Sequence, residues 1–312
     1  MSKDLILGLD CGATKVLSQF AYFDPDLGLV VPDGKSNEVL YSEDQDWNNN
    51  FKPVPISHQK KEFEKNTIKL LKSENDQGLV IIKTIKKVVD KFNHIKSSIC
   101  YPGVKNNDGV IIMANGPRIP KLRIELNHFK KIYNDSDCCI LGEWKSSVGS
   151  MIDVQNGLYI GGGTGIADGI INKSKLINFN RTKGLKRSWE LFHNEISIEQ
   201  LLSPRGLIVN YNNKFNERIN SLNDLVQSEH CFEILEGAVE ALSVLIKNRV
   251  EFFNKNKTNL DLVVIGQRLG LFLSNQNNQI QEMFKSCTEV PIKFSHDRRT
   301  ASLGAIYSLS YF

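Results

Sequence analysis

Several common features are missing from the sequence, and each absence excludes a class of protein. None of the six cysteines forms a C-x-x-C pair, so neither a zinc site nor a disulfide framework is expected. No apolar run is long enough to span a membrane, and the first residues, 1–4, do not resemble a signal peptide. The net charge is only +4, and no basic block is interleaved with aromatic residues. We therefore expect a cytoplasmic protein with no nucleic-acid or membrane partner.

The sequence does contain enough apolar residues for one large core or two medium ones, since 41% of its 312 residues are hydrophobic. Short apolar runs predict strands at 5–9, 16–23, 38–41, 97–101, 109–114, 138–141, 158–163, 170–177, 260–265 and 290–294. Apolar residues at helical spacing predict helices at 62–72, 81–92, 120–133, 144–151, 198–211, 232–253 and 301–309. The polar segment 42–60 is expected to be a loop. Such alternation of strands and helices indicates α/β layers.

The first predicted strand runs into a turn of small residues, and this stretch is the first candidate site. Asp10 stands at the end of the strand, where a carboxylate can hold a hydrated magnesium ion. Gly12 lets the backbone approach a ligand, so that N–H groups can face phosphate oxygens. Thr14 adds a hydroxyl group, and Lys15 adds a positive charge. Taken alone, the stretch is equally compatible with an ordinary hairpin turn.

A second turn, at 161–169, is the richest glycine loop in the chain. It has neither the Walker pattern nor the dinucleotide fingerprint, but consecutive glycines with Thr164 suit a backbone cradle for phosphate. Each of the two loops directly follows an apolar strand, and they lie about 150 positions apart. This pairing indicates two related lobes that hold one phosphate chain.

The order of these features resembles that of bacterial glucokinases and ROK sugar kinases, within the broad actin/hexokinase/Hsp70 fold. The matching stretches cover nearly the whole chain, at 7–15, 101–103, 113–116, 158–169, 198–203, 263–266 and 301–305. The resemblance implies an α/β protein with two lobes, actin/hexokinase-like (ribonuclease H-like), with a mixed sheet in each. We expect a small N-terminal lobe at 1–116, completed by a C-terminal helix at 298–312, and a larger lobe at 117–297.

The resemblance also implies roles for the residues at matching positions. Phosphate contacts are expected from the first loop and from the second, at Asp10, Gly12, Thr14, Lys15, Gly163, Thr164 and Gly165, with Asp10 near the metal. Gly266 would begin the loop that holds adenosine, although the family usually has a second glycine where Gln267 stands. Asn115, with Gly116 beside it, and Glu199 match the sugar-binding positions.

One departure from the family concerns the general base. The family places an Asn-Asp pair after the strand that we predict at 138–141, and its Asp takes the proton from the sugar hydroxyl. This sequence has Gly142-Glu143 there. Glu is one methylene longer than Asp, and a misplacement of about 1 Å can cost ~100-fold in rate. Glu143 is therefore expected to be the base, in a loop that Gly142 leaves free to adjust.

A second departure concerns the sugar pocket. Where glucokinases carry a Glu and a His in a glycine-rich loop, this sequence has Thr182-Lys183-Gly184-Leu185-Lys186-Arg187. Plain glucose is therefore doubtful. The cations Lys183, Lys186 and Arg187 either receive an anionic sugar or are solvated loop charges, and the sequence does not decide between these.

Our leading hypothesis is an ATP-dependent carbohydrate kinase that uses Mg²⁺ and transfers the γ-phosphate to a hydroxyl of a hexose or hexose derivative. The alternative is a nucleotide- or sugar-binding homologue with weakened or lost catalysis, since the base and the pocket both depart from the family. A repressor of the family is not favoured, because no helix-turn-helix pattern precedes Leu5. The expected partner is a small sugar, and a homodimer is left open.

Overall fold

The computed structural model describes residues 4–179 and 181–311, which form two compact units. Unit 1 comprises Met1–Val148 with Arg299–Phe312, and unit 2 comprises Gly149–Arg298. The chain therefore divides after residue 148, and not after residue 116 as the sequence analysis expected. The segment 117–148 belongs to unit 1 because its strand joins the first sheet and its helix packs on the C-terminal helix.

The sheet of unit 1 has the strand order β3-β2-β1-β4-β7. Its strands are β1 (Ile6–Cys11), β2 (Lys15–Asp24), β3 (Leu29–Leu40), β4 (Lys96–Tyr101) and β7 (Tyr133–Asn134). The first three strands are antiparallel, whereas β1, β4 and β7 are parallel. β3 begins nine residues before the predicted start at Glu38, despite Pro32 and Gly34. As the edge strand of the sheet, β3 can tolerate a proline and the glycine of a bulge.

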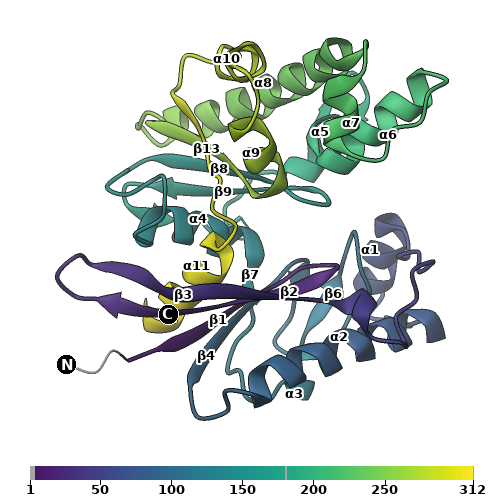
Figure 1. Cartoon of the computed structure of the whole chain (residues 1–312), viewed down its shortest axis with the longest axis vertical. Helices are drawn as coiled ribbons and strands as arrows, with labels where there is room; N and C mark the ends of the chain where they lie inside the picture. Colours follow the sequence, from purple (N-terminus) through teal and green to yellow (C-terminus); the bar gives the residue numbers. More distant parts are fainter. Residues whose placement is uncertain (1–3, 180, 312) are drawn as a thin grey trace. The chain divides into compact units, whose positions relative to one another are not determined.

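Helices cover both faces of this sheet (Figure 1). They are α1 (Ile56–Glu64), α2 (Lys72–Asp90), α3 (Leu122–Glu125), α4 (Asp135–Lys145) and α11 (Thr300–Tyr311), with a 3-10 turn, η1, at Tyr41–Glu43. The apolar side of α2 packs on one face, through Ile81, Ile85 and Val88. α11 packs on the other face so closely that a Cβ on Gly8 of β1 would lie 2.3 Å from the carbonyl oxygen of Ser302. The last predicted helix is confirmed, with this role.

Several predictions in unit 1 were wrong. The segment 42–60 is not all loop, because α1 begins at Ile56. The helix predicted at 120–133 shrinks to the four residues of α3. The predicted strand at 138–141 and helix at 144–151 are replaced by the single helix α4. α4 packs directly on α11, since a Cβ on Gly142 would lie 1.8 Å from the Thr300 carbonyl oxygen.

The sheet of unit 2 has the strand order β10-β9-β8-β13-β14. Its strands are β8 (Gly157–Gly162), β9 (Ile166–Asn172), β10 (Lys175–Leu176), β13 (Leu262–Gly266) and β14 (Ile292–Phe294). Here too the first three strands in sequence are antiparallel, and β8, β13 and β14 are parallel. The order and directions therefore repeat those of unit 1, and the turn between β1 and β2 corresponds to the turn between β8 and β9.

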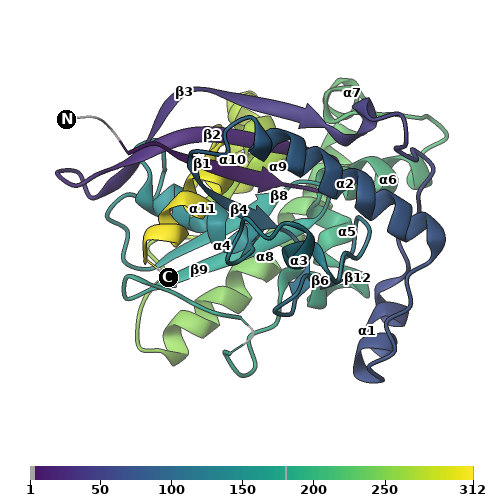
Figure 2. The same cartoon turned by 90° about the horizontal axis from the view of Figure 1, so that it is seen from below.

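Helices of unit 2 bury one large core against this sheet. They are α5 (Ile198–Leu202), α6 (Pro204–Lys214), α7 (Leu222–Gln227), α8 (Cys231–Lys255), α9 (Gln267–Ser274) and α10 (Asn278–Lys285). α8 confirms the predicted long helix, and its buried positions Leu235, Leu242 and Leu245 follow helical spacing. Figures 1 and 2 show α8 running along the sheet of this unit.

Smaller elements complete the two units. They are β5 (Val104–Lys105) and β6 (Val110–Ile112) in unit 1, and η2 (Ser188–Glu190), β11 (Phe192–His193) and β12 (Ile196–Ser197) in unit 2. Among residues 4–179 and 181–311, no helix combines the length and apolarity needed to cross a bilayer.

Candidate active site

Three parallel strands of unit 1 end at one edge of its sheet. In the register of the sheet, Asp10 pairs with Cys100 of β4, and Cys100 pairs with Tyr133 of β7. Neighbouring strands lie about 4.8 Å apart, so residues at the ends of β1 and β7 are roughly 10 Å apart. In open α/β sheets, ligands bind outside the carboxyl ends of the strands. The structure therefore brings Asp10 to the same edge as the residues that follow Tyr133.

Asp10 lies beside two buried thiols. The Cys100 thiol donates to its Oδ1 at 3.7 Å. Burial raises the pKa of the Cys11 thiol well above its ordinary value, and the neighbouring charge of Asp10 adds to this effect. A thiol that stays protonated is neither a nucleophile nor a competing metal ligand. Asp10 is therefore the side chain here that can contact a hydrated magnesium ion, as the sequence analysis predicts.

The turn that follows Asp10 is held by backbone hydrogen bonds. The Gly12 N–H donates to the Lys15 carbonyl at 2.9 Å, and the Tyr41 hydroxyl donates to the Gly12 carbonyl at 3.3 Å. A Cβ on Gly12 would meet nothing closer than 3.9 Å. Lys15 is paired with Glu38 on β3, so its charge is already partly compensated within the sheet. Thr14, which precedes Lys15 in the turn, is exposed.

The residues after β7 offer a second candidate for the Asn-Asp pair of the family. Asn134 ends β7 and is the N-cap of α4, and Asp135 is the first residue of that helix. An Asn-Asp pair directly after a strand is the arrangement that the family resemblance requires. Asn134-Asp135 therefore stands where the resemblance predicts such a pair, whereas the strand predicted before Gly142-Glu143 is part of helix α4. A signal was present in the sequence, because an Asn followed by Asp135 and Asp137 is typical of a helix N-terminus.

Glu143 lies eight residues further along, inside α4, and its side chain is fully buried. The segment around Gly142, which we expected to be an adjustable loop, is part of a helix in close contact with α11. A Cβ on Gly142 would lie only 1.8 Å from the Thr300 carbonyl oxygen. Asp135 is only half-buried, and its carboxylate accepts no hydrogen bond within the part of the chain that the structure describes. Of these two carboxylates, Asp135 is the one that a ligand can reach.

A lysine lies within electrostatic reach of Asp135. Lys105, on β5, donates from Nζ to the Gly103 carbonyl at 2.9 Å. Burial lowers the pKa of the Lys105 ammonium, and the charges of Asp135 and Asp137 act in the opposite direction. The sequence analysis did not single out Lys105, because nothing in a lone lysine after a turn indicates burial. It adds a cationic group beside the candidate base.

The loop that carries Asn115 reaches the first turn. A Cβ on Gly116 would lie 3.8 Å from the Ala13 Cβ, so the two segments are in contact. Asn115 is half-buried, and its side-chain amide makes no hydrogen bond to the residues described. Unit 1 thus gathers the predicted residues Asp10, Gly12 and Asn115 near one edge.

The second turn belongs to unit 2 and presents backbone. The Gly163 N–H donates to the Gly165 carbonyl at 2.9 Å, and no atom would lie within 4 Å of a Cβ on Gly163. Glu199, at the start of α5, accepts from the Ile166 N–H at 3.2 Å. Burial raises the pKa of Glu199, partly offset by that hydrogen bond and by the charge of Arg205. The structure therefore brings Gly163, Thr164 and Gly165 together with the predicted carboxylate Glu199.

Gly266 ends the strand next to β8 and lies opposite Gly161 in the register. A Cβ there would come within 2.5 Å of the Tyr159 hydroxyl, so only glycine fits. Gln267, where the family usually has a glycine, adopts φ +58. This left-handed backbone favours glycine, the residue that the resemblance leads us to expect there.

The basic loop before η2 is fixed by a buried ion pair. Arg249 of α8 donates from Nε to Asp168 at 2.7 Å and from Nη2 to the Lys186 carbonyl at 2.8 Å. The Arg187 guanidinium lies 5.6 Å from the centre of the Phe179 ring. Lys183 and Lys186 are exposed. Arg187 is thus engaged with unit 2 itself, and of the three cations at 183–187 the two lysines face the solvent.

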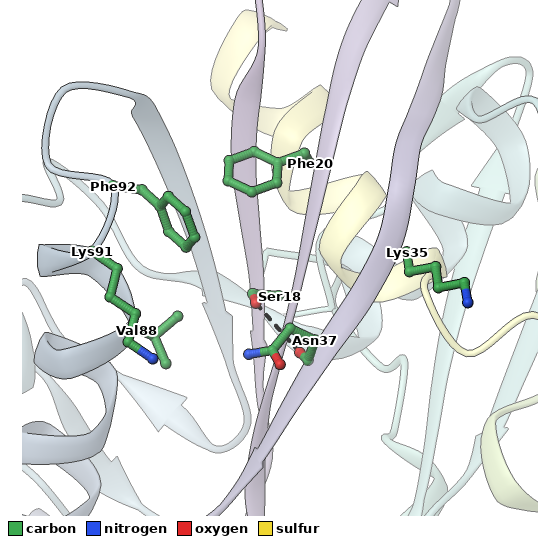
Figure 3. Close-up of a pocket in the computed structure, with 7 residues that line it drawn as sticks. All are labelled: Ser18, Phe20, Lys35, Asn37, Val88, Lys91 and Phe92. Atoms are coloured by element: carbon green, nitrogen blue, oxygen red, sulfur yellow. Dashed lines mark hydrogen bonds between the residues drawn. The ribbon is translucent and has the colours of Figure 1, made fainter.

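A pocket of about 240 Å³ lies elsewhere in unit 1, between α2 and the β2–β3 hairpin (Figure 3). It is lined by Ser18, Phe20, Lys35, Asn37, Val88, Lys91 and Phe92. Its floor is apolar, with the Phe20 and Phe92 rings edge to face at 4.9 Å. Figure 3 shows the Lys35 amine directed away from these rings. No predicted site residue lines this pocket.

A metal, if bound, would not be held by a protein cage. Within the described residues no three His, Cys, Asp or Glu side chains cluster as metal ligands. Magnesium typically keeps several waters and uses one or two carboxylates together with phosphate oxygens. Asp10 fits that mode of binding.

No family model matches the sequence, and no curated protein matches it. Solved structures do match, and they show a fold of the actin/hexokinase type. Several of the matching structures are described as ROK family proteins. A ROK hexokinase from Thermus thermophilus superposes with a TM-score of 0.60 at 15% identity, over 98% of this chain and 99% of that one. The predicted fold is therefore confirmed.

Two further matches show the range of function that this fold supports. A ROK glucokinase from Streptomyces griseus, solved with glucose and AMPPNP, matches with a TM-score of 0.54 at 14% identity, covering 96% of this chain and 97% of its own. A ROK family transcriptional regulator, a homologue of the E. coli MLC protein, matches with a TM-score of 0.61 at 12% identity, covering 96% and 76%. Both kinases and regulators thus share the fold, and the site must decide the function.

Proposed function

We propose that this protein is an ATP-dependent sugar kinase in which Asp135 is the general base. The observation that carries the proposal is the position of Asp135, accessible at the start of α4 and at the same sheet edge as Asp10. The Asp135 carboxylate would accept the proton of the attacking sugar hydroxyl, and Asn115 and Glu199 would orient the sugar. The Streptomyces neighbour, which holds glucose and an ATP analogue, supports this class of substrate.

The remaining residues would hold the nucleotide. Backbone groups at Gly12 and at Gly163–Gly165 would contact phosphate oxygens, with Thr14, Thr164 and Lys15 adding side-chain contacts, and Gly266 would approach the adenosine. Bound Mg²⁺ would neutralise the charge of the phosphates, with Asp10 as its contact in the protein. Phosphoryl transfer depends mainly on such positioning and charge neutralisation, with one base to orient the hydroxyl.

The alternative of a binding protein without turnover loses one of its two supports. It rested on the missing Asn-Asp pair and on the basic loop at 182–187. Asn134-Asp135 is a candidate for the Asn-Asp pair. In the basic loop, Arg187 contacts the Phe179 ring of unit 2. The exposed cations Lys183 and Lys186 are a reason to include acidic sugars among the substrates to be tested.

The test is ATP consumption with Mg²⁺ against neutral, N-acetylated, amino and acidic sugars. With the best sugar, Asp135→Asn should lower kcat by roughly 10²–10⁴-fold, the usual contribution of a general base. Asp137→Asn, in the same turn of α4, is the matched control and should retain most of the activity. Glu143→Gln tests the assignment made from sequence, and a folded variant should turn over. Wild-type kcat in Asp135→Asn would overturn the proposal, as would ATP binding without turnover on any sugar.

A further inference from the structure

The loop between Met113 and Arg118 is closed at its base by the backbone. The Val110 N–H donates to the Ile119 carbonyl at 2.9 Å, and the Ile119 N–H donates to the Val110 carbonyl at 3.0 Å. Asn115, the proposed sugar ligand, lies between these points. A ligand-binding amide needs a fixed backbone, since a displacement of about 1 Å weakens its contacts severely. Two further groups of contacts fix this loop.

The first group is the side-chain amide of Gln59 on α1, which is fully buried. Its Oε1 accepts from the Met113 N–H at 2.8 Å, and its Nε2 donates to the Met113 carbonyl at 2.9 Å. Nε2 also donates to the Val54 carbonyl at 2.6 Å. Gln59 therefore satisfies both backbone groups of Met113, as a neighbouring strand would, and ties the start of the loop to α1.

The second group holds the end of the loop through a buried ion pair. Arg118 donates from its backbone N–H to Glu74 Oε1 at 3.0 Å, and from Nε and Nη2 to the two carboxylate oxygens at 2.8 Å each. The side chains of Arg118 and Glu74 are both wholly inaccessible to solvent. Nη1 pairs with Glu62 of α1, and Nη2 also reaches the Lys69 carbonyl. One carboxylate of α2 thus holds both the backbone and the side chain of the last loop residue.

Stability alone does not explain this arrangement. A buried ion pair is often no better for stability than well-packed apolar residues, because the desolvation of both charges offsets their attraction. What the pair provides is a fixed geometry, since a bidentate carboxylate permits only one orientation of the guanidinium. Between Met113 and Arg118, only the four residues 114–117 lack such contacts, and Asn115 is among them.

We propose that Gln59, Glu74 and Arg118 are positioning residues that fix the Asn115 loop and thereby set the affinity for the sugar. This inference rests on the proposed kinase function. It predicts that loosening either end of the loop raises the KM for the sugar, whereas the KM for ATP stays near the wild-type value. The sequence alone does not indicate the arrangement, because its three residues are spread over 59–118.

The first experiment combines steady-state kinetics with hydrogen exchange of the full chain. In Glu74→Gln, an NH2 group replaces one of the two oxygens that accept from Arg118, so the pair is broken, the sugar KM should rise about 10- to 100-fold, and exchange should increase at the Arg118 amide. Gln59→Leu should have the same kinetic effect, with increased exchange at the Met113 amide. Glu125→Gln, which removes an exposed pair with Lys86 in the same unit, is the control and should change neither measurement.

A second variant separates positioning from stability. Glu74→Leu combined with Arg118→Met replaces the buried pair with apolar groups and should recover thermal stability. If the pair positions the loop, the sugar KM stays raised in this stable double variant, and a wild-type KM would overturn the inference. Absence of sugar turnover in the wild-type protein overturns the proposed function. Turnover with an unchanged sugar KM in Glu74→Gln overturns the positioning role alone.

Discussion

The two units have sheets of the same order and strand directions, yet their equivalent turns offer a ligand different chemistry. The turn between β1 and β2 in unit 1 is flanked by Asp10 and Lys15, and Asp135 lies at the same sheet edge. The turn between β8 and β9 in unit 2 has no charged side chain from 161 to 167 and presents glycine backbone. The same topology thus supplies ionic side chains in one half and N–H donors in the other.

Among the residues that the structure describes, each unit has one arginine that is wholly buried, and each of these arginines contacts a loop of the candidate site. Arg118 in unit 1 is shared by two carboxylates, Glu74 and Glu62. Arg249 in unit 2 has a single carboxylate, Asp168, and otherwise donates to the Lys186 carbonyl and the Asn248 amide oxygen. The positive charge of Arg249 is therefore compensated by one carboxylate, whereas that of Arg118 is compensated by two.

The largest effect is expected from removing that single partner. Asp168→Ala leaves the Arg249 charge buried without compensation, which should lower the free energy of unfolding by about 3–5 kcal/mol. Glu74→Ala should cost less, because Glu62 remains beside Arg118. Urea unfolding of both variants measures the difference, with Glu282→Gln as an exposed control in unit 2, where about 1 kcal/mol or less is expected. Equal losses in the two units would remove the contrast between the arginines.

The next effect concerns ligand binding and leaves the fold intact. Gly163→Ala places a methyl group where nothing lies within 4 Å, so stability should be nearly unchanged. If the turn contacts phosphate through its backbone, the methyl group should weaken ATP binding by about 10- to 100-fold, equivalent to one charged hydrogen bond. Gly12→Ala should weaken it less, because side chains share the contacts in unit 1. Calorimetric titration with ATP and Mg²⁺ measures both.

Gly237→Ala is the matched control for these variants. It adds a methyl group in open space on α8 and should leave ATP affinity unchanged. Wild-type affinity in Gly163→Ala would show that the second turn is an ordinary hairpin and would leave unit 1 as the only supplier of phosphate contacts among the described residues.

The contrast between the turns could be predicted from the sequence, but the candidate base Asp135 could not. Both glycine turns follow strands whose apolar runs are buried, which is the clearest signal that a sequence gives. β7 has only two residues, and its pairing with β4, not its own propensity, makes it a strand. Residues 138–141 are buried on all sides of α4, so they show no helical periodicity and were taken for a strand.

The residues that we propose as positioning residues could not be predicted from the sequence either. Gln59 and Glu74 are polar residues on helices, and a periodic pattern assigns such residues to the solvent. Their burial follows from a tertiary contact with the loop at 113–118, which no local rule describes. Likewise, the left-handed backbone of Gln267 is invisible in a sequence that has no glycine there.

The smallest predicted effect is a change in Tm that distinguishes a carboxylate that stabilises the fold from one that binds a ligand. Burial raises the pKa of Glu199, so its ionised form opposes folding above the ordinary glutamate pKa, and the penalty disappears below it. Glu199→Gln should therefore raise the Tm at pH 7 by about 1–2 °C, with a gain that shrinks as the pH falls toward 4.5, the ordinary value. Glu74→Gln should instead lower the Tm at pH 7, because it breaks a buried pair.

Thermal unfolding from pH 4.5 to 8, together with the sugar KM, tests this distinction. If the Glu199 carboxylate binds the sugar, the Glu199→Gln protein should be more stable at neutral pH and should have a raised sugar KM. The reason is that the Gln amide still accepts from the Ile166 N–H but carries no charge. A loss of stability at pH 7 would instead make Glu199 a structural partner of the second turn. Unit 2 would then supply the sugar with no carboxylate from α5, and recognition of the sugar would fall to the Asn115 loop of unit 1.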